Sequence, residues 1–162
     1  MGPGMSRTQA ARWPSLALWI ILCEGTGWIA SQWKPGAWYA ALVKPAWNPP
    51  GSVFFPVWTL LYALMGVAAW LVWQKADAPG RRFALGLFLV QLLLNGAWSW
   101  IFFGLHAITA ALYEIALLWL AILATMLAFR RISRASAWLL APYLVWVSFA
   151  TALTFALFRL NG

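Results

Sequence analysis

Five apolar segments, each of about 20 residues, constrain this chain more than any other feature. They run over residues 14–33, 53–74, 83–104, 109–129 and 137–158. A helix of this length can cross the hydrocarbon core of a bilayer. Because lipid offers the backbone no hydrogen-bond partners, helices are the economical way to cross it. We therefore predict an all-α membrane protein, a bundle of five transmembrane helices that forms one domain over residues 1–162.

The charged residues are too few to cover a surface in contact with water. The chain is 64% hydrophobic and 9% charged, whereas soluble domains average about 45–50% and about 25%. Its formal net charge of +8 comes from basic residues at the ends of the apolar segments. Such residues anchor helices to lipid headgroups and set their orientation. We therefore expect the lipid bilayer to be the partner and no nucleic acid to bind.

The basic residues divide unequally between the two sides of the predicted bundle. Eight belong to one side: Arg7, Arg12, Lys75, Arg81, Arg82, Arg130, Arg131 and Arg134. Three belong to the other: Lys34, Lys44 and Arg159. Because the more basic side usually faces the cytoplasm, we predict a cytoplasmic N-terminus, with the first loop and the C-terminus outside. The basic charge and the absence of organelle signals fit a bacterial cell membrane.

The first apolar segment has an alternative interpretation as a signal peptide. Arg7 and Arg12 precede it, and residues 30–32 weakly resemble a cleavage site. Glu24 and Trp28 interrupt the apolar run, which favours a retained helix.

The loop after the first segment combines proline with aromatic residues, in the stretch WYAALVKPAWNPPGSVFFPVWTLLY. Prolines at positions 45, 49, 50 and 56 fix the backbone and restrict the preceding residues. We therefore expect an ordered loop. Its large flat side chains, Trp38, Tyr39, Trp47 and Phe54, suggest a lid over a ligand pocket.

Three predicted helices each carry aromatic or polar residues at helical spacing. The aligned sets are Trp58, Tyr62 and Met65; Gln91, Asn95, Trp98 and Phe102; and Pro142, Trp146 and Ala150. An amide such as Gln91 or Asn95 is costly in lipid and is expected to point into the bundle. Together with Trp98, the two amides would suit a flat apolar ligand that carries a few acceptors. Alternatively, they hold helices together without a ligand.

Other reactive residues are few. Glu24 and Glu114 lie inside predicted spans, where a carboxylate is a functional candidate. Glu114 is about five residues from its predicted helix start, so we expect it to snorkel toward the interface. One histidine, His106, and one cysteine, Cys23, predict no metal site. The sequence also contains no Gly-x-Ser-x-Gly elbow and no phosphate-binding glycine loop.

These residues resemble those of a known family, and the resemblance extends from the first predicted helix to Arg159. The matching motifs, in chain order, are Trp38-Tyr39, Lys44-Pro45-x-Trp47-x-Pro49-Pro50, Phe55-Pro56-x-Trp58-Thr59-x-x-Tyr62, Gln91-x-x-x-Asn95-x-x-Trp98, Phe102-Phe103-Gly104 and Pro142-Tyr143-x-x-Trp146 followed by Ala150. The chain resembles bacterial members of the translocator protein and tryptophan-rich sensory protein family, the TspO/MBR or peripheral-type benzodiazepine receptors.

The resemblance implies a five-helix bundle whose first loop folds over a pocket. It implies a membrane receptor or sensor that binds porphyrins such as protoporphyrin IX or haem as ligands, with no obligatory cofactor, and that forms a homodimer. The implied pocket residues are Tyr39, Pro49, Trp58, Gln91, Asn95, Trp146 and Ala150. The residue patterns above add Trp47, Tyr62 and Trp98 as ligand-binding candidates.

Two further activities are alternatives. Light-dependent porphyrin breakdown in some bacterial relatives is ascribed to tryptophans that match Trp58 and Trp146, which are the catalytic candidates here. Transport of a tetrapyrrole or lipid is the other. Residues 153–159 resemble a weak sterol-contact pattern, but Phe155 stands where tyrosine is expected and Thr154 where many members have asparagine.

Overall fold

A computed structural model describes residues 12–162, and the regular secondary structure of this part of the chain is all helical, without strands. Its elements are α2 (Arg12–Ala30), α3 (Ala37–Ala41), η1 (Gly51–Val53), α4 (Phe54–Trp73), α5 (Arg81–Ser99), η2 (Trp100–Gly104), α6 (Ile108–Ile132), α7 (Arg134–Leu139) and α8 (Ala141–Asn161). The predicted all-α class is confirmed. Arg7, which entered the charge count above, lies outside the described residues.

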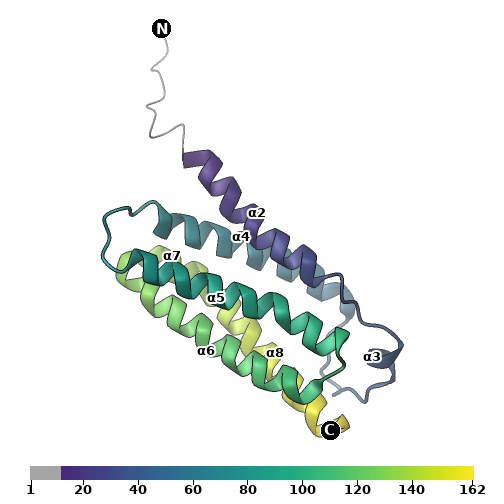
Figure 1. Ribbon diagram of the computed structural model, residues 1–162. Helices are drawn as coiled ribbons and strands as arrows, with labels where there is room; N and C mark the ends of the chain where they lie inside the picture. The colour runs from purple at the N-terminus through teal and green to yellow at the C-terminus, as the bar shows by residue number, and fades with distance from the viewer. Residues whose placement is uncertain (1–11) are drawn as a thin grey trace.

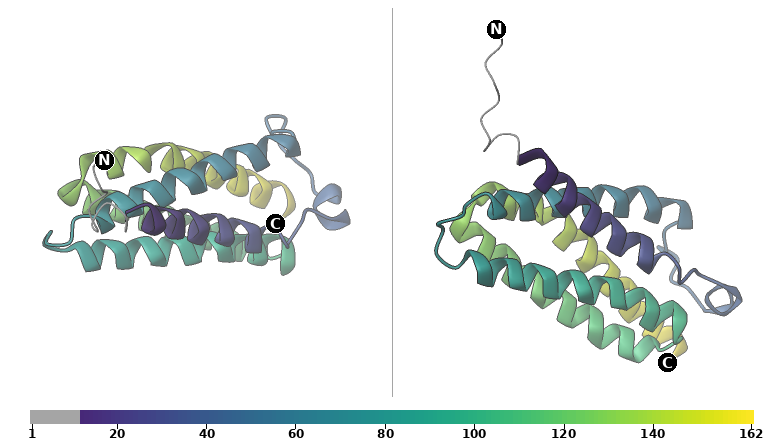
Figure 2. Two further views of the ribbon diagram at one scale, coloured as in Figure 1. Left: turned by 90° about the horizontal axis from the view of Figure 1, so that it is seen from above. Right: turned by 45° about the horizontal axis from the view of Figure 1, so that its top comes forward.

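The long helices lie side by side and run back and forth between two ends of the molecule (Figure 1). One end holds the α4–α5 turn and α7. The opposite end holds the first loop with α3, the α5–α6 turn and the C-terminus (Figures 1 and 2). The first loop and the last turn of α8 are therefore neighbours, although they are far apart in sequence.

Four helical stretches are long and apolar enough to cross a membrane. They are Gly51–Trp73, Arg81–Gly104, Ile108–Ile132 and Arg134–Asn161, of 23 to 28 residues each. By length and composition, this finding supports the predicted integral membrane protein. The helix α2, with 19 residues, is not among these four.

Local sequence explains where several helices begin. Gly80 adopts a φ of 77° directly before α5, a conformation that glycine reaches without a steric penalty. The Ser133 side chain accepts a hydrogen bond from the Ser136 N–H at 3.3 Å and caps α7. Pro56 and Pro142 each lie in the first turn of a helix, where a missing N–H breaks no hydrogen bond.

The end of α5 widens into a turn of π-helix, Trp100–Gly104. The Leu105 N–H donates to the Trp100 carbonyl at 2.9 Å, which closes this wider turn. Phe102 is buried within it. Such turns are frequent at functional sites, and this one brings Phe102 and Phe103 against the first loop.

The helix α2 packs closely along α4. Gly66 of α4 lies so near Ile20 that an added Cβ would be 2.8 Å from the Ile20 Cα. Trp19 packs edge-on against Trp73 and Phe88, with ring centroids 6.0 and 5.8 Å apart. Trp19 and Phe88 belong to the central core, in which Met65 is fully buried.

Candidate functional site

Four buried polar side chains from three helices form a continuous hydrogen-bonded chain, which we call the tyrosine–amide network. Tyr62 of α4 donates its hydroxyl hydrogen to the Asn95 side-chain carbonyl on α5. The Asn95 amide donates to the Tyr143 hydroxyl of α8 at 3.0 Å, and that hydroxyl donates to the Gln91 Oε1 at 2.9 Å. The predicted residues Tyr62, Gln91 and Asn95 therefore do point into the bundle, where they connect α4, α5 and α8.

Three N–H donors near this network are buried without a hydrogen-bond partner among the described residues. They belong to the Gln91 Nε2 and to the indole nitrogens of Trp98 and Trp146. The Gln91 side chain is 1% exposed, so water does not reach it from the surface. An unpaired buried donor costs about 1–3 kcal/mol. Each of these atoms is therefore a buried donor that finds no acceptor within residues 12–162.

Trp58 forms an aromatic wall beside the network. Its ring stacks on Tyr62, with centroids 5.4 Å apart, and meets Tyr143 edge-on at 6.2 Å. The predicted candidates Trp58, Tyr62, Gln91 and Asn95 thus form one continuous group, and Tyr143 joins them.

The first loop contributes a second aromatic group through Tyr39 of α3. The Tyr39 ring packs edge-on against Phe102 and Phe103 at 6.1 and 5.5 Å. Phe102 in turn stacks on Trp98 at 4.9 Å. The Tyr39 hydroxyl donates to the Asn48 Oδ1 at 3.3 Å. Burial raises the pKa of Tyr39, and the bond to Asn48 partly offsets this rise.

Trp146 belongs to a third aromatic group, on α8. Its ring lies 5.7 Å from Phe54 and 5.4 Å from Phe149. Phe149 also meets Trp47 of the first loop edge-on at 5.9 Å, although Trp47 itself is half exposed.

The remaining two candidates lie at the margins of these groups. Ala150 packs against the central core from the face of α8 that carries Trp146. Pro49 is half-buried in the first loop, and its carbonyl accepts a 3.3 Å hydrogen bond from the Asn48 amide.

The last turn of α8 fastens the first loop through one side chain. The Asn161 Oδ1 accepts from the Val43 N–H at 2.8 Å, and the Asn161 amide donates to the Val43 carbonyl at 2.9 Å. We call this pair of bonds the loop latch. It joins positions 118 residues apart, and sequence reasoning did not find it.

The Glu114 side chain does not lie where the sequence analysis placed it. Both carboxyl oxygens are buried and have no hydrogen-bond partner among residues 12–162, so the side chain does not snorkel to the interface. The reason is its register, because Ala111, Ile115 and Leu118 of the same face of α6 are buried in the bundle. Glu24 is half-buried on α2.

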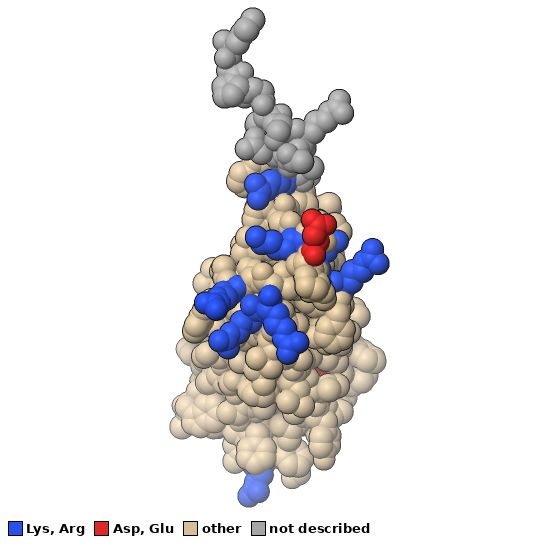
Figure 3. Space-filling view, turned by 90° about the vertical axis from the view of Figure 1, so that its left-hand side faces the viewer, with Lys and Arg blue, Asp and Glu red and all other residues tan. Residues whose placement is uncertain are grey.

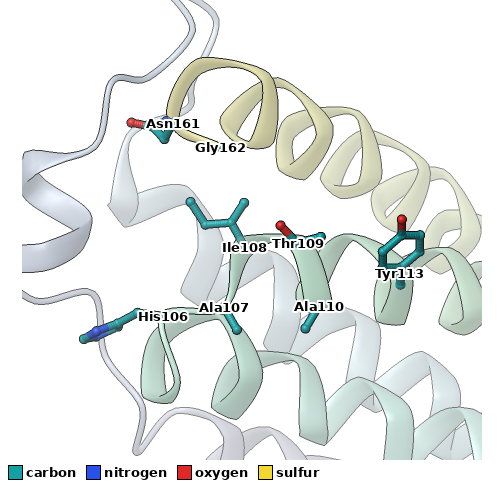
Figure 4. A pocket seen from close by; sticks show the side chains of 8 residues that line it. All are labelled: His106, Ala107, Ile108, Thr109, Ala110, Tyr113, Asn161 and Gly162. Atoms are coloured by element: carbon teal, nitrogen blue, oxygen red, sulfur yellow. The ribbon is translucent and has the colours of Figure 1, made fainter.

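Two hollows on the described part of the chain lie away from these aromatic groups. One has a volume of about 600 Å³ and opens where α6 begins, between that helix and the last residues of α8 (Figure 4). His106 borders it but points toward the first loop, where its ring stacks on Trp38 at 4.3 Å. The other hollow lies between α6 and α7.

Sequence reasoning missed the central position of Tyr143. We grouped Pro142, Trp146 and Ala150 as one face, but Pro142 is exposed and Tyr143 is fully buried. The buried stripe of α8 runs through Tyr143, Val147 and Thr154. This stripe follows the helical repeat of 3.6 residues from Tyr143, but the same repeat also fits a stripe that starts at Pro142, so periodicity alone could not select Tyr143. Among the described residues, no group of histidine, cysteine and acidic side chains could hold a metal ion.

Comparison with known proteins identifies the family of this chain. The chain is 46% identical to the tryptophan-rich protein TspO of Chlorobaculum tepidum, over 91% of this chain and 96% of that protein. It is 37% identical to the protein CrtK of Rhodobacter capsulatus, over 90% and 91%. Its identity to the human translocator protein is 43%, over 76% and 75%. The TspO/MBR family model matches residues 16–160. This integral membrane protein therefore belongs to the TspO/MBR family.

Proposed function

We propose that the protein is a membrane receptor or sensor that binds flat tetrapyrroles, such as protoporphyrin IX or haem, between the aromatic groups described above. The observation that carries this proposal is the set of three buried N–H donors without partners, on Gln91, Trp98 and Trp146. A porphyrin combines a large apolar ring with a few acceptor atoms. It would bury its ring against the indoles, and the π face of the ring could accept from these donors.

The carboxylates of a porphyrin need a cation, which the helix interiors lack. Lys44 of the first loop is a candidate, because it lies beside Tyr39. Its ammonium group lies 4.8 Å from the centre of the Tyr39 ring and donates to the carbonyls of Ala40 and Leu42 at 3.1 and 3.0 Å. The carboxylates would therefore lie at the loop end, with Lys34 and Arg159 as further partners.

Titration with protoporphyrin IX, followed by quenching of tryptophan fluorescence, tests the proposal. We expect Trp58→Ala/Trp146→Ala to weaken binding at least tenfold, because an aromatic pair contributes about 0.5–1.5 kcal/mol and about 1.4 kcal/mol corresponds to a factor of ten. The matched control is Trp13→Ala/Trp28→Ala, since both side chains are 68% exposed on α2. Equal affinity in both double variants would contradict the site assignment.

We further propose that α2 is a fifth transmembrane helix and that the first loop is a lid. Nineteen helical residues extend about 28 Å, close to the thickness of the hydrocarbon core. The Trp70 indole donates to the Ser15 hydroxyl at 3.2 Å, and Gly66 contacts Ile20, so α2 follows α4 closely. These contacts favour a retained helix over a cleaved signal peptide. The loop latch would hold the lid shut over the aromatic groups.

A homodimer in a bacterial cell membrane completes the proposal. Along α5, Phe83, Val90 and Leu93 are exposed apolar residues, and an added Cβ at Gly86 would meet no atom within 4 Å. A second copy of this face could pack there closely. Light scattering of the purified protein in detergent would measure the mass of the assembly, and a monomer would contradict the dimer.

Light-dependent porphyrin breakdown is a second candidate function. The stacking of Trp58 on Tyr62 favours it, because this contact joins an indole to the start of the tyrosine–amide network. Such a pair could supply one electron and one proton to an excited porphyrin, which would leave the Trp58 indole as a radical. Dissolved dioxygen would then be the oxidant that opens the porphyrin ring. Illumination of the complex would then bleach the Soret band in the wild type but not in Trp58→Phe/Trp146→Phe. Bleaching at the same rate in both would exclude these tryptophans as partners.

A further inference from the structure

A groove on the outer surface combines an apolar floor with two arginines at one end. It has a volume of about 380 Å³ and lies between the end of α6 and α7. Its lining residues are Leu123, Met126, Leu127, Arg130, Arg134, Ala137 and Trp138. The volume is within the range of about 300–1,000 Å³ that is typical of small-molecule sites.

The break between α6 and α7 produces this arrangement. Ser133 is extended, with φ −151° and ψ 111°, and turns the chain between the two helices. Arg130 in the last turn of α6 and Arg134 at the start of α7 consequently border one groove. Leu127 lies one turn of α6 before Arg130, so the groove changes from apolar to basic along the helix axis.

The chain itself supplies no anion at this groove. It has three acidic residues, Glu24, Asp77 and Glu114, and none of them lines the groove. Glu114 is on α6 but lies 16 residues before Arg130, which corresponds to about 24 Å along the helix. An anionic partner for the two guanidinium groups must come from outside.

The position of the groove along the bundle indicates what that partner is. Trp138 is 76% exposed at the same end, as expected for an indole at the depth of lipid headgroups. The floor residues belong to a helix that is long and apolar enough to cross the membrane. Lysine and arginine also gather at this end of the molecule (Figure 3). Guanidinium groups bind phosphate through paired hydrogen bonds, and basic grooves of this kind suit anionic headgroups.

We propose that the α6–α7 groove binds an anionic phospholipid, with its phosphate between Arg130 and Arg134 and the upper part of an acyl chain along Leu123 and Leu127. This site is separate from the proposed porphyrin site. It would make the protein's stability depend on the charge of the lipid in the adjacent leaflet.

Native mass spectrometry of the full chain in detergent, titrated with phosphatidylglycerol, tests the proposal. We expect Arg130→Gln/Arg134→Gln to weaken the first binding event at least tenfold. The matched control is Arg81→Gln/Arg82→Gln, which removes the same charge at the same end of the bundle but outside the groove. An equal loss in both variants would overturn the site and leave only general charge attraction.

Two further measurements make the result specific. Met126→Trp fills the groove without changing its charge, so it should also weaken phosphatidylglycerol binding. Unchanged binding would contradict an acyl chain in the groove.

The second measurement compares ligands. Phosphatidylcholine with the same acyl chains and free glycerol phosphate should each bind the wild type at least tenfold more weakly than phosphatidylglycerol. If phosphatidylcholine bound as tightly as phosphatidylglycerol, selection by charge would be refuted. If glycerol phosphate bound as tightly, the groove would be a phosphate site that needs no lipid, and the lipid proposal would be overturned.

Discussion

At the scale of single residues, the Tyr143 hydroxyl links two amides, because it is both acceptor and donor in the tyrosine–amide network. Tyr143→Phe would leave the Asn95 amide and the Gln91 carbonyl unpaired inside the bundle. We expect a loss of about 1–2 kcal/mol in the free energy of unfolding, measured by titration with a denaturing detergent. Tyr113→Phe is the control, since Tyr113 is 74% exposed. Losses of the same size in the two variants would contradict the role of the network.

The Glu114 carboxyl group contrasts with the Tyr143 hydroxyl, because it is buried without a hydrogen-bond partner among the described residues. A polar group that is buried without a hydrogen bond costs about 1–3 kcal/mol. Glu114→Leu should therefore raise the free energy of unfolding, in the same assay, by about 1 kcal/mol or more. A more stable variant that binds protoporphyrin IX less well would assign the carboxyl to the ligand, whereas a less stable variant would show that it has a structural partner.

At the scale of elements, the loop latch is the contact that most directly controls the first loop. Asn161→Ala removes both bonds to Val43. We expect faster hydrogen exchange over residues 37–50, by about tenfold, because two hydrogen bonds of about 0.5–1.5 kcal/mol each are lost. Gln32→Ala is a suitable control, since the Gln32 amide bonds to the Trp28 carbonyl within its own segment. Exchange that does not change in Asn161→Ala would show that the aromatic contacts of Tyr39 and Trp47 hold the loop alone.

The elements also show how far the sequence predicts this fold. Apolar length and breakers such as Gly80 are local signals, so the long helices and their turns could be located. The cost of placing an amide in lipid correctly predicted that Gln91 and Asn95 both face the interior. Periodicity could not choose between Pro142 and its neighbour Tyr143 as the inward residue, because that choice depends on how α8 is rotated against α5. The loop latch joins residues that are distant in sequence, and no local sequence pattern predicts such a contact.

At the scale of the whole molecule, the basic residues are divided unequally between the two ends of the bundle. Of the described basic residues, Arg12, Lys75, Arg81, Arg82, Arg130, Arg131 and Arg134 belong to one end, and Lys34, Lys44 and Arg159 to the other. Figure 3 shows this gathering of lysine and arginine on the face around the first end. The asymmetry persists without Arg7, so the predicted orientation does not depend on residues before α2.

Reporter fusions test this orientation in a bacterial cell. Because the more basic end stays in the cytoplasm, alkaline phosphatase fused after Gly162 should be active, and a fluorescent protein fused there should not fluoresce after export as an unfolded chain. Fusions after Gln74, in the α4–α5 turn, should give the reverse pattern. The two positions lie at opposite ends of the bundle (Figure 1), so each controls for expression of the other. Phosphatase activity of the fusion after Gln74, together with fluorescence of the fusion after Gly162, would show that the orientation is the reverse of the predicted one. The Lys44 end would then face the cytoplasm, and a porphyrin would reach the first loop from inside the cell.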